Sequence, residues 1–100
     1  MKIVMVCAYG MSTSMLMKKM NAAAEEKGIA IEISAHTPIE MEEQKFDCDI
    51  ILLGPQVAYH KERIQTIYPN IPVKAIEMMD YGMMNGTKVL DDALTAVKNR

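Results

Sequence analysis

The regular alternation of strand-like and helix-like segments is the feature that most restricts the fold of this sequence. Short apolar runs cover residues 2–6, 29–35, 49–53 and 72–76, and helical patterns cover residues 12–27, 37 to about 45, 57–68 and 87–98. Strands separated by helices form right-handed crossovers, which place the strands parallel in one sheet. The pattern predicts a three-layer α/β fold, with helices on both faces of a four-stranded parallel sheet.

The apolar content of the runs predicts the order of the strands. Residues 50–53 are all aliphatic and residues 3–6 are all apolar, as expected for strands that are covered on both faces. These two strands should be central, which gives the order 2-1-3-4 and a topological switch point beside the first strand. Ligands of open α/β sheets bind at the carboxyl ends of the strands near such a point.

Local signals set the ends of several elements. Gly28 is expected to end the first helix as its C′ residue. Thr37 and Glu40 form a capping box, with Pro38 at the first helical position. Residues 77–86 are interpreted as a longer loop, at whose end Asn85 or Gly86 caps the last helix.

The composition excludes several classes of function. The 100 residues are interpreted as one domain, 1–100, and the net charge of −2 lacks the basic footprint of a nucleic-acid-binding protein. No apolar run approaches the roughly 20 residues that span a bilayer. Cys7 and Gly10 end the first apolar run too early for a signal peptide. We therefore expect a cytoplasmic protein.

Cys7 and the residues after it form the candidate functional loop. The loop joins the first strand to the first helix and consists of Ala8, Tyr9, Gly10, Met11, Ser12, Thr13 and Ser14. Free N–H groups and the helix dipole at such a helix start bind anions, and the hydroxyl groups cap the helix or bind the same anion. A thiol there is more often the nucleophilic thiolate. The pattern suggests phosphoryl transfer through sulfur; the alternative is a small buried hydrophobe beside an ordinary helix cap.

Three loops are expected to converge on Cys7. Gly54, Pro55 and Gln56 follow the third strand, and the loop that carries Tyr81 follows the fourth. Because the carboxyl ends of parallel strands meet at one edge of the sheet, these loops should surround the Cys7 loop. This convergence favours the functional interpretation of Cys7 over the structural one.

Other candidate residues do not join this site. Cys48 precedes the third strand at the opposite end of the sheet. A five-residue strand spans roughly 17 Å, whereas a disulfide needs Cα atoms within about 7 Å, so no bridge between Cys7 and Cys48 is expected. His36 and His60 lack metal-ligand spacing with either cysteine and are interpreted as surface or structural residues. No metal site is expected from these residues.

The loop also lacks a residue that a related chemistry requires. Cysteine, five residues, then arginine and serine or threonine is the signature of low-molecular-weight tyrosine phosphatases, but Thr13 occupies the position of the arginine. Without a bidentate phosphate clamp, hydrolysis of a stable phosphoester should be poor. A cysteine that accepts a phosphoryl group from an activated donor needs less help.

The sequence resembles enzyme IIB of the lactose/cellobiose family of the phosphoenolpyruvate-dependent sugar phosphotransferase system. The matching residues are Cys7 with residues 10–14, residues 52–59, and Tyr81 with Gly82. The alternation of elements also matches, so the resemblance covers the whole chain, and it is closer to the cellobiose/diacetylchitobiose-type branch than to the lactose branch. The implied fold resembles that of low-molecular-weight tyrosine phosphatases. Tyr9 is a departure, because that branch usually carries a small residue there.

The resemblance implies a phosphocysteine relay. Cys7 would accept a phosphoryl group from a phosphohistidine of the IIA protein and pass it to a cellobiose- or chitobiose-type β-disaccharide presented by the membrane component IIC. The N–H groups of residues 8–14 would hold the phosphoryl oxygens. The expected rim that binds IIA and IIC in turn consists of Met11, Met15, Pro55, Tyr59 and Tyr81. Gln56 would bind the phosphoryl group or brace the loop.

Two functions of other classes stay open at this point. One is a phosphatase-like or arsenate-reductase-like cysteine enzyme, and the other is a regulatory module in which phosphorylation of Cys7 controls a partner. A monomer is expected, because no helix pattern shows a surplus apolar stripe. The protein would act in the cytoplasm and transiently at the inner face of the membrane.

Overall fold

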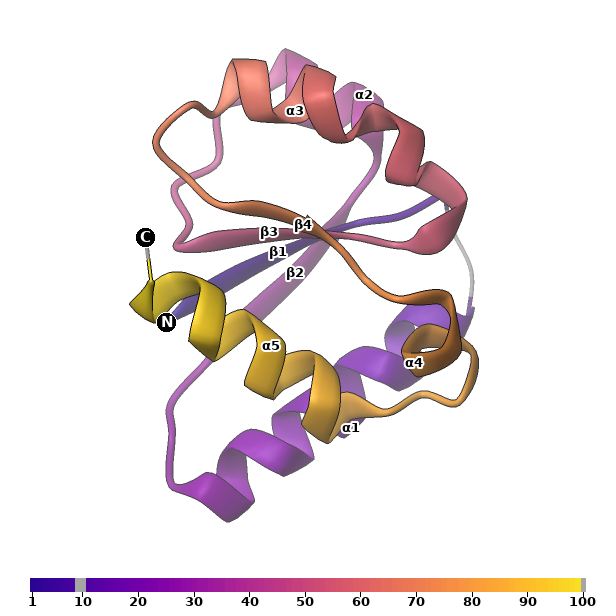
Figure 1. Ribbon diagram of the computed structural model, residues 1–100, viewed down its shortest axis with the longest axis vertical. Helices are drawn as coiled ribbons and strands as arrows, with labels where there is room; N and C mark the ends of the chain where they lie inside the picture. The colour runs from indigo at the N-terminus through magenta and orange to yellow at the C-terminus, as the bar shows by residue number, and fades with distance from the viewer. Residues whose placement is uncertain (9–10, 100) are drawn as a thin grey trace.

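A parallel sheet lies at the centre of the molecule (Figure 1). The computed structural model describes residues 1–8 and 11–99, without the side chain of Met11. The strands are β1 (Lys2–Val6), β2 (Glu32–His36), β3 (Ile50–Leu53) and β4 (Val73–Ala75). They pair in parallel in the order β2-β1-β3-β4. The sequence-based prediction of the sheet and of its strand order is confirmed.

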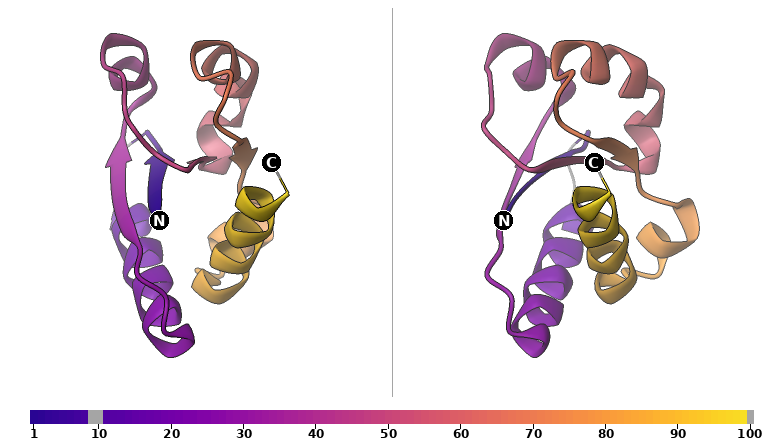
Figure 2. Two further views of the ribbon diagram at one scale, coloured as in Figure 1. Left: turned by 90° about the vertical axis from the view of Figure 1, so that its left-hand side faces the viewer. Right: turned by 60° about the vertical axis from the view of Figure 1, so that its left-hand side comes forward.

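Helices cover both faces of the sheet, which gives the predicted three layers (Figures 1 and 2). The helices are α1 (Met11–Lys27), α2 (Pro38–Glu43), η1 (Pro55–His60, a 3₁₀ helix), α3 (Lys61–Ile67), α4 (Met78–Gly82) and α5 (Gly86–Lys98). On one face, Leu16 of α1 and Leu90 of α5 pack with Met5 of β1 in one core cluster. On the other face, Met41 of α2 and Ile64 of α3 pack in a second cluster.

The second strand begins later than predicted. Residues 29–31 were expected in the strand, but β2 starts at Glu32. Gly28 has a φ of +69°, its N–H donates to the Glu25 carbonyl, and the Ile29 N–H donates to the Ala24 carbonyl. These two bonds form a Schellman motif, which uses the residues after the helix to reverse the chain. The prediction that Gly28 ends α1 is confirmed.

Two helical segments differ from the prediction. Residues 77–86 contain α4 in place of a continuous loop. The helix expected over residues 57–68 is divided, because η1 begins at Pro55 and Val57 has φ −120° and ψ 15° inside it. Regular α-helix starts only at Lys61. Neither α4 nor η1 has a side-chain cap, so both lack the usual sequence signal of a helix start.

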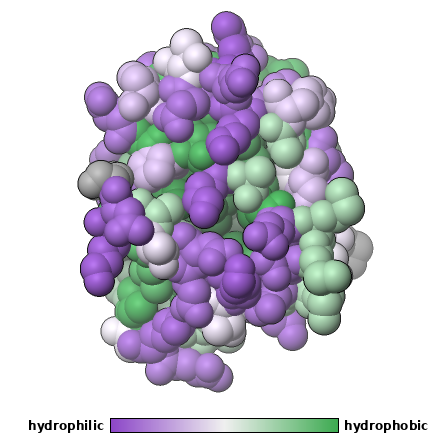
Figure 3. All heavy atoms as spheres, in the orientation of Figure 1, coloured by the Kyte–Doolittle hydropathy of each residue, from purple (hydrophilic) through white to green (hydrophobic). Residues whose placement is uncertain are grey.

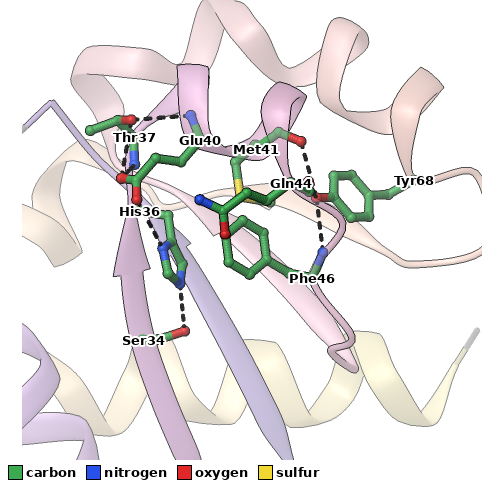
Figure 4. Close-up of polar contacts among 8 residues, drawn as sticks. All are labelled: Ser34, His36, Thr37, Glu40, Met41, Gln44, Phe46 and Tyr68. Carbon is green, nitrogen blue, oxygen red and sulfur yellow. Dashed lines mark hydrogen bonds and ion pairs between the residues drawn. The ribbon is translucent and has the colours of Figure 1, made fainter.

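Tyr68 connects α3 to the segment that follows α2, and its hydroxyl is expected to be important for stability. The side chain is 4% exposed. Its hydroxyl lies within donating distance of the carbonyls of Met41 (3.1 Å) and Gln44 (2.9 Å) and accepts from the Phe46 N–H at 3.3 Å (Figure 4). Tyr68→Phe would leave these groups without the hydroxyl, at an expected cost of about 1–3 kcal/mol.

Urea unfolding measures this cost, with Tyr59→Phe as the matched control. Tyr59 is 80% exposed, so its variant should unfold at the wild-type urea concentration. Equal midpoints for Tyr68→Phe and the wild type would contradict the structural role of the Tyr68 hydroxyl.

The described residues contain no helix that combines the length and the apolar character needed to cross a membrane.

Candidate functional site

Cys7 lies at the edge of the sheet where β1 and its two neighbours, β2 and β3, end. Its backbone N–H donates to the His36 carbonyl of β2 at 3.0 Å. On the other side, the Gly54 N–H donates to the Val6 carbonyl at 2.9 Å. The residue is 8% exposed, and its backbone is held between the ends of β2 and β3. The predicted position of Cys7, beside the switch point of the sheet, is therefore correct.

The first turn of α1 contributes the second part of the site. Ser12 and Ser14 are exposed, whereas Thr13 is 3% exposed. The Thr13 hydroxyl is 3.0 Å from the Tyr81 hydroxyl of α4, and either group can donate. Among the other predicted loop residues, Ala8 is exposed, while Tyr9, Gly10 and the side chain of Met11 lie outside the described residues.

The segments after β3 and β4 meet at Gly54, as the sequence predicts. A Cβ on Gly54 would lie 3.3 Å from Oε1 of Gln56, 3.6 Å from the Val6 carbonyl oxygen and 3.7 Å from a ring carbon of Tyr81. The absence of a side chain at Gly54 thus lets Gln56 and Tyr81 approach the end of β1. Three chain segments surround the Cys7 region: the start of α1, the start of η1 and α4.

The remaining residues of the predicted rim are more open. Pro55 is half-buried, and Met15 is 48% exposed. The Tyr59 ring packs against the His60 ring at a centroid distance of 4.2 Å. These side chains are free to touch a partner.

Sequence reasoning missed one wall of the site. A pocket of about 120 Å³ is lined by Cys7, Thr13, Ser14, Ala35, His36, Thr37 and Glu40. Its last four residues come from the end of β2 and the start of α2. The capping box was recognised in the sequence, and the parallel pairing of the first two strands places it beside Cys7; combining the two signals would have found this wall.

The polar groups of this wall are already bonded to one another (Figure 4). The Thr37 N–H donates to Oε1 of Glu40 at 2.9 Å, and the Glu40 N–H donates to the Thr37 hydroxyl. His36 lies 3.6 Å from Oε2 of Glu40 and 3.0 Å from the Ser34 hydroxyl, and its ring stacks on Phe46 at 4.0 Å. These contacts support the structural interpretation of His36.

Glu40 makes the same wall anionic at neutral pH. The hydrogen bond from the Thr37 backbone N–H lowers the pKa of the Glu40 carboxyl, and the Thr37 hydroxyl and His36 lower it further against the opposing effect of desolvation. A negative phosphoryl group would therefore gain no attraction from this wall. The donors that could hold such a group come from the α1 side of the pocket.

The second cysteine is separate from the site. Cys7 and Cys48 are both free thiols, so the prediction that they do not pair is confirmed. Cys48 is near the start of β3, where the neighbouring Asp49 N–H donates to the Lys2 carbonyl of β1. Desolvation, together with the charges of Asp47 and Asp49, raises the pKa of the Cys48 thiol to about 11. It therefore stays protonated at neutral pH and is a poor nucleophile.

The hydrogen bond between Thr13 and Tyr81 is expected to couple the two residues energetically. Thr13→Val and Tyr81→Phe should each cost about 1 kcal/mol of stability, because each removes the same part-buried bond. The double variant should therefore cost about as much as either single variant, and not their sum. Urea unfolding of the wild type, the two single variants and the double variant measures this double-mutant cycle. Additive costs would contradict the coupling.

Comparisons with known proteins match nearly the whole chain. The sequence profile described as "PTS system, Lactose/Cellobiose specific IIB subunit" matches residues 2–92. The galactose-specific EIIB component of Lactococcus lactis subsp. cremoris is 41% identical over 88% of each chain. The oligo-beta-mannoside-specific EIIB component of Bacillus subtilis is 38% identical over 99% of this chain and 98% of its own length. The cellobiose-specific EIIB component of Lactococcus lactis subsp. lactis is 40% identical over 88% of each chain.

Solved structures agree with the sequence relatives. The cellobiose-specific phosphotransferase IIB component of Borrelia burgdorferi superposes with a TM-score of 0.80 at 40% identity, over 99% of this chain and 93% of that one. The lactose-specific IIB domain of Streptococcus pneumoniae superposes with a TM-score of 0.83 over 96% of each chain. Its identity is 19%, so it supports the fold alone.

Proposed function

Because the chain belongs to the lactose/cellobiose-specific IIB family of the sugar phosphotransferase system, we propose that Cys7 is the residue that carries the phosphoryl group. Members of this family are sugar phosphotransferases that work with IIA and IIC partners. One observation supports the proposal above all: Cys7 directly follows β1 and shares a pocket with Thr13 and Ser14, from the first turn of α1. The other cysteine is buried at a distance from this turn and stays protonated.

In the proposed first step, the Cys7 thiolate attacks the phosphorus of a phosphohistidine on IIA. The S–P bond forms while the P–N bond breaks, and its electron pair returns to the imidazole nitrogen. In the second step, a sugar hydroxyl oxygen attacks the phosphorus, the S–P bond breaks, and its electron pair returns to sulfur as the hydroxyl loses its proton. No electrons are gained or lost overall, and no cofactor takes part.

The protein assists both steps mainly by positioning and electrostatics, as is general for phosphoryl transfer. Backbone N–H groups of the loop from Ala8 to Ser14 would face the phosphoryl oxygens, and the helix dipole of α1 would favour their charge. The hydroxyl groups of Ser12, Thr13 and Ser14 are further candidate donors. Gln56 sits beside Gly54, where it can donate to the same group or brace the loop.

The partners would meet this site in turn. The proposed rim contains Met15, Pro55, Tyr59 and Tyr81, together with Met11, whose side chain lies outside the described residues. IIA would bind first as phosphodonor, and the membrane component IIC would then present the sugar. The chain would act as one monomeric phosphotransferase domain in the cytoplasm, transiently at the inner face of the membrane. A cellobiose- or chitobiose-type β-disaccharide is proposed as the sugar, which the cellobiose-specific relative supports.

A hydrolytic function fits the site less well. Residues 8–14 contain no arginine or lysine, so the loop has no side-chain cation for a stable phosphoester. The nearest charged wall carries the Glu40 carboxylate. The missing side-chain cation is the feature that disfavours the phosphatase-like alternative.

Sugar phosphate formation tests the proposal. The protein is mixed with the general phosphotransfer proteins, a cognate IIA, membrane vesicles that hold IIC, labelled phosphoenolpyruvate and cellobiose. Label is expected in a sugar phosphate with the wild type and with Cys48→Ala, and not with Cys7→Ala. Release of the label as inorganic phosphate, without sugar phosphate, would favour the hydrolase.

A further inference from the structure

Three methionines on and next to α4 form an exposed apolar surface. Met78, Met79 and Met83 are 77%, 74% and 75% exposed. Figure 3 has a pale green group at the right-hand side of the molecule, where Figure 1 places α4. We call these three residues the α4 methionine surface. Elsewhere in the described residues, the large exposed apolar side chains are Met15, Ile39 and Tyr59, from three different helices.

Packing within the chain does not account for these methionines. None of the residues of α4 is buried. Tyr81 is the side chain that joins α4 to the core cluster on the α1 side, and Asp80 pairs with Lys88 of α5 at 3.6 Å. The methionines instead face outward, where apolar area is unfavourable unless a partner covers it.

The α4 methionine surface continues the rim of the candidate site. Tyr81 belongs to the same short helix, and its hydroxyl contacts Thr13 in the first turn of α1. Its ring also lies beside Gly54, which is bonded to the end of β1. Because phosphoryl transfer brings the donor atom within bonding distance of the Cys7 sulfur, the donor protein must lie across the surface around Cys7. A protein seated there reaches α4.

We propose that Met78, Met79 and Met83 are the docking contact for the phosphodonor protein IIA, an inference that rests on the proposed function of Cys7. Methionine is flexible and polarisable, which suits a contact that forms and dissociates in every cycle. The sequence did not locate this surface, and the absence of a surplus apolar helix face was the reason to expect a monomer.

The surrounding charges favour a protein over a lipid surface as the occupant. Glu77, Asp80 and Asp92 line one pocket beside α4 together with Lys74, and Lys88 pairs with Asp80 and Asp92. Three carboxylates against two ammonium groups make the area net negative. It would repel the anionic lipids of a membrane surface and attract a partner with basic side chains around an apolar centre.

The test is the rate of phosphorylation as a function of the concentration of phosphorylated IIA. Met78→Gln, Met79→Gln and Met83→Gln are combined, because glutamine keeps the side-chain length and the helix propensity but removes the apolar contact. The KM for phosphorylated IIA should rise about tenfold, the scale expected when anchor side chains are removed from an interface, and kcat should stay within about twofold. The matched variant, with leucine at all three positions, should keep a KM close to that of the wild type.

Each other outcome overturns the inference in a recognisable way. An unchanged KM in the glutamine variant, with the wild type fully phosphorylated, removes the α4 surface from IIA docking and leaves the proposed function intact. Absence of phosphorylation in the wild type would contradict both the docking role of the α4 methionine surface and the proposed function of Cys7. The occupant is instead a second copy if wild-type dimerisation, measured by sedimentation, is lost in the glutamine variant while KM is unchanged. The occupant is a membrane if the wild type binds phosphatidylglycerol vesicles, the glutamine variant does not, and KM is unchanged.

Discussion

Gly86→Ala is expected to lower the free energy of unfolding by about 1–3 kcal/mol, the usual cost of overpacking a filled core. Gly86 is the buried first residue of α5, at the point where this helix crosses α1. A Cβ there would lie 2.5 Å from the carbonyl carbon of Lys19, 2.5 Å from its Cβ and 2.7 Å from the Met20 nitrogen. Two of these are backbone atoms inside a helix, so α5 itself would have to move away from α1.

Moving α5 would also disturb the packing of side chains further along this helix. Leu90 of α5 packs in the same core cluster as Leu16 and Met20 of α1, so a displaced α5 loosens the contacts on that whole face of the sheet. The melting temperature should fall by roughly 5–20 °C, since 1 kcal/mol corresponds to several degrees in a domain of this size.

Gly82→Ala is the matched control for this substitution. A Cβ on Gly82 meets nothing within 4 Å, and the residue lies at the end of α4. Its variant should melt within about 4 °C of the wild type, because a Gly-to-Ala change at a site without strain costs little. Differential scanning calorimetry measures the melting temperatures of both variants and of the wild type. A Gly86→Ala protein that melts with the wild type would show that α1 and α5 are not in the close contact described.

Cys7→Ser is expected to abolish phosphoryl transfer, with a loss of at least about 10³-fold, as for other enzymes that lose their nucleophile. A serine hydroxyl is a much weaker nucleophile than a cysteine sulfur at neutral pH, because the hydroxyl is almost entirely protonated. The fold should survive, because the two side chains differ little in volume and the substitution keeps the backbone bond from Cys7 to His36.

Two measurements check this prediction. Rapid quench-flow with labelled, phosphorylated IIA gives the rate at which the protein accepts the phosphoryl group. Circular dichroism reports whether the variant is folded. Cys48→Ala should accept the label at the wild-type rate, because Cys48 lies near the amino end of β3 with a protonated thiol. Substantial acceptance by a folded Cys7→Ser protein would contradict the role of Cys7.

The order of the sheet could be predicted because burial leaves a direct trace in the sequence. The strands β1 and β3 are covered by helices on both faces, and β3 is accordingly a run of four aliphatic residues, all buried. Because βαβ crossovers are right-handed, knowing which two strands are central leaves few possible strand orders. The position of Cys7 followed from this topology.

The elements that were missed depend on contacts that a local pattern does not contain. Strand β2 starts at Glu32 because the Glu32 N–H donates to the Met1 carbonyl, and this partner lies 31 positions away in the sequence. Helix α4 is short, has no side-chain cap and buries none of its residues, so neither a cap nor an apolar stripe marks it. The inward hydrogen bond of α4, between Tyr81 and Thr13, again joins residues that are distant in sequence.

The candidate site was predicted in part for the same reason. The loop after β1 and Gly54 could be placed at one edge of the sheet from topology alone. The wall formed by His36, Thr37 and Glu40 lies at the end of β2, which is hydrogen-bonded to Cys7. Finding it required combining the capping box with the predicted pairing of the first two strands. A capping box read in isolation indicates only a helix start.

Locating the phosphoryl group on the protein tests directly whether Cys7 carries it. The wild type is incubated with phosphorylated IIA, its intact mass is measured, and the modified peptide is mapped. We expect a mass gain of one phosphoryl group, carried by Cys7. A phosphoryl group mapped to Cys48, His36 or His60, or no mass gain with a IIA that phosphorylates a related IIB, would contradict it.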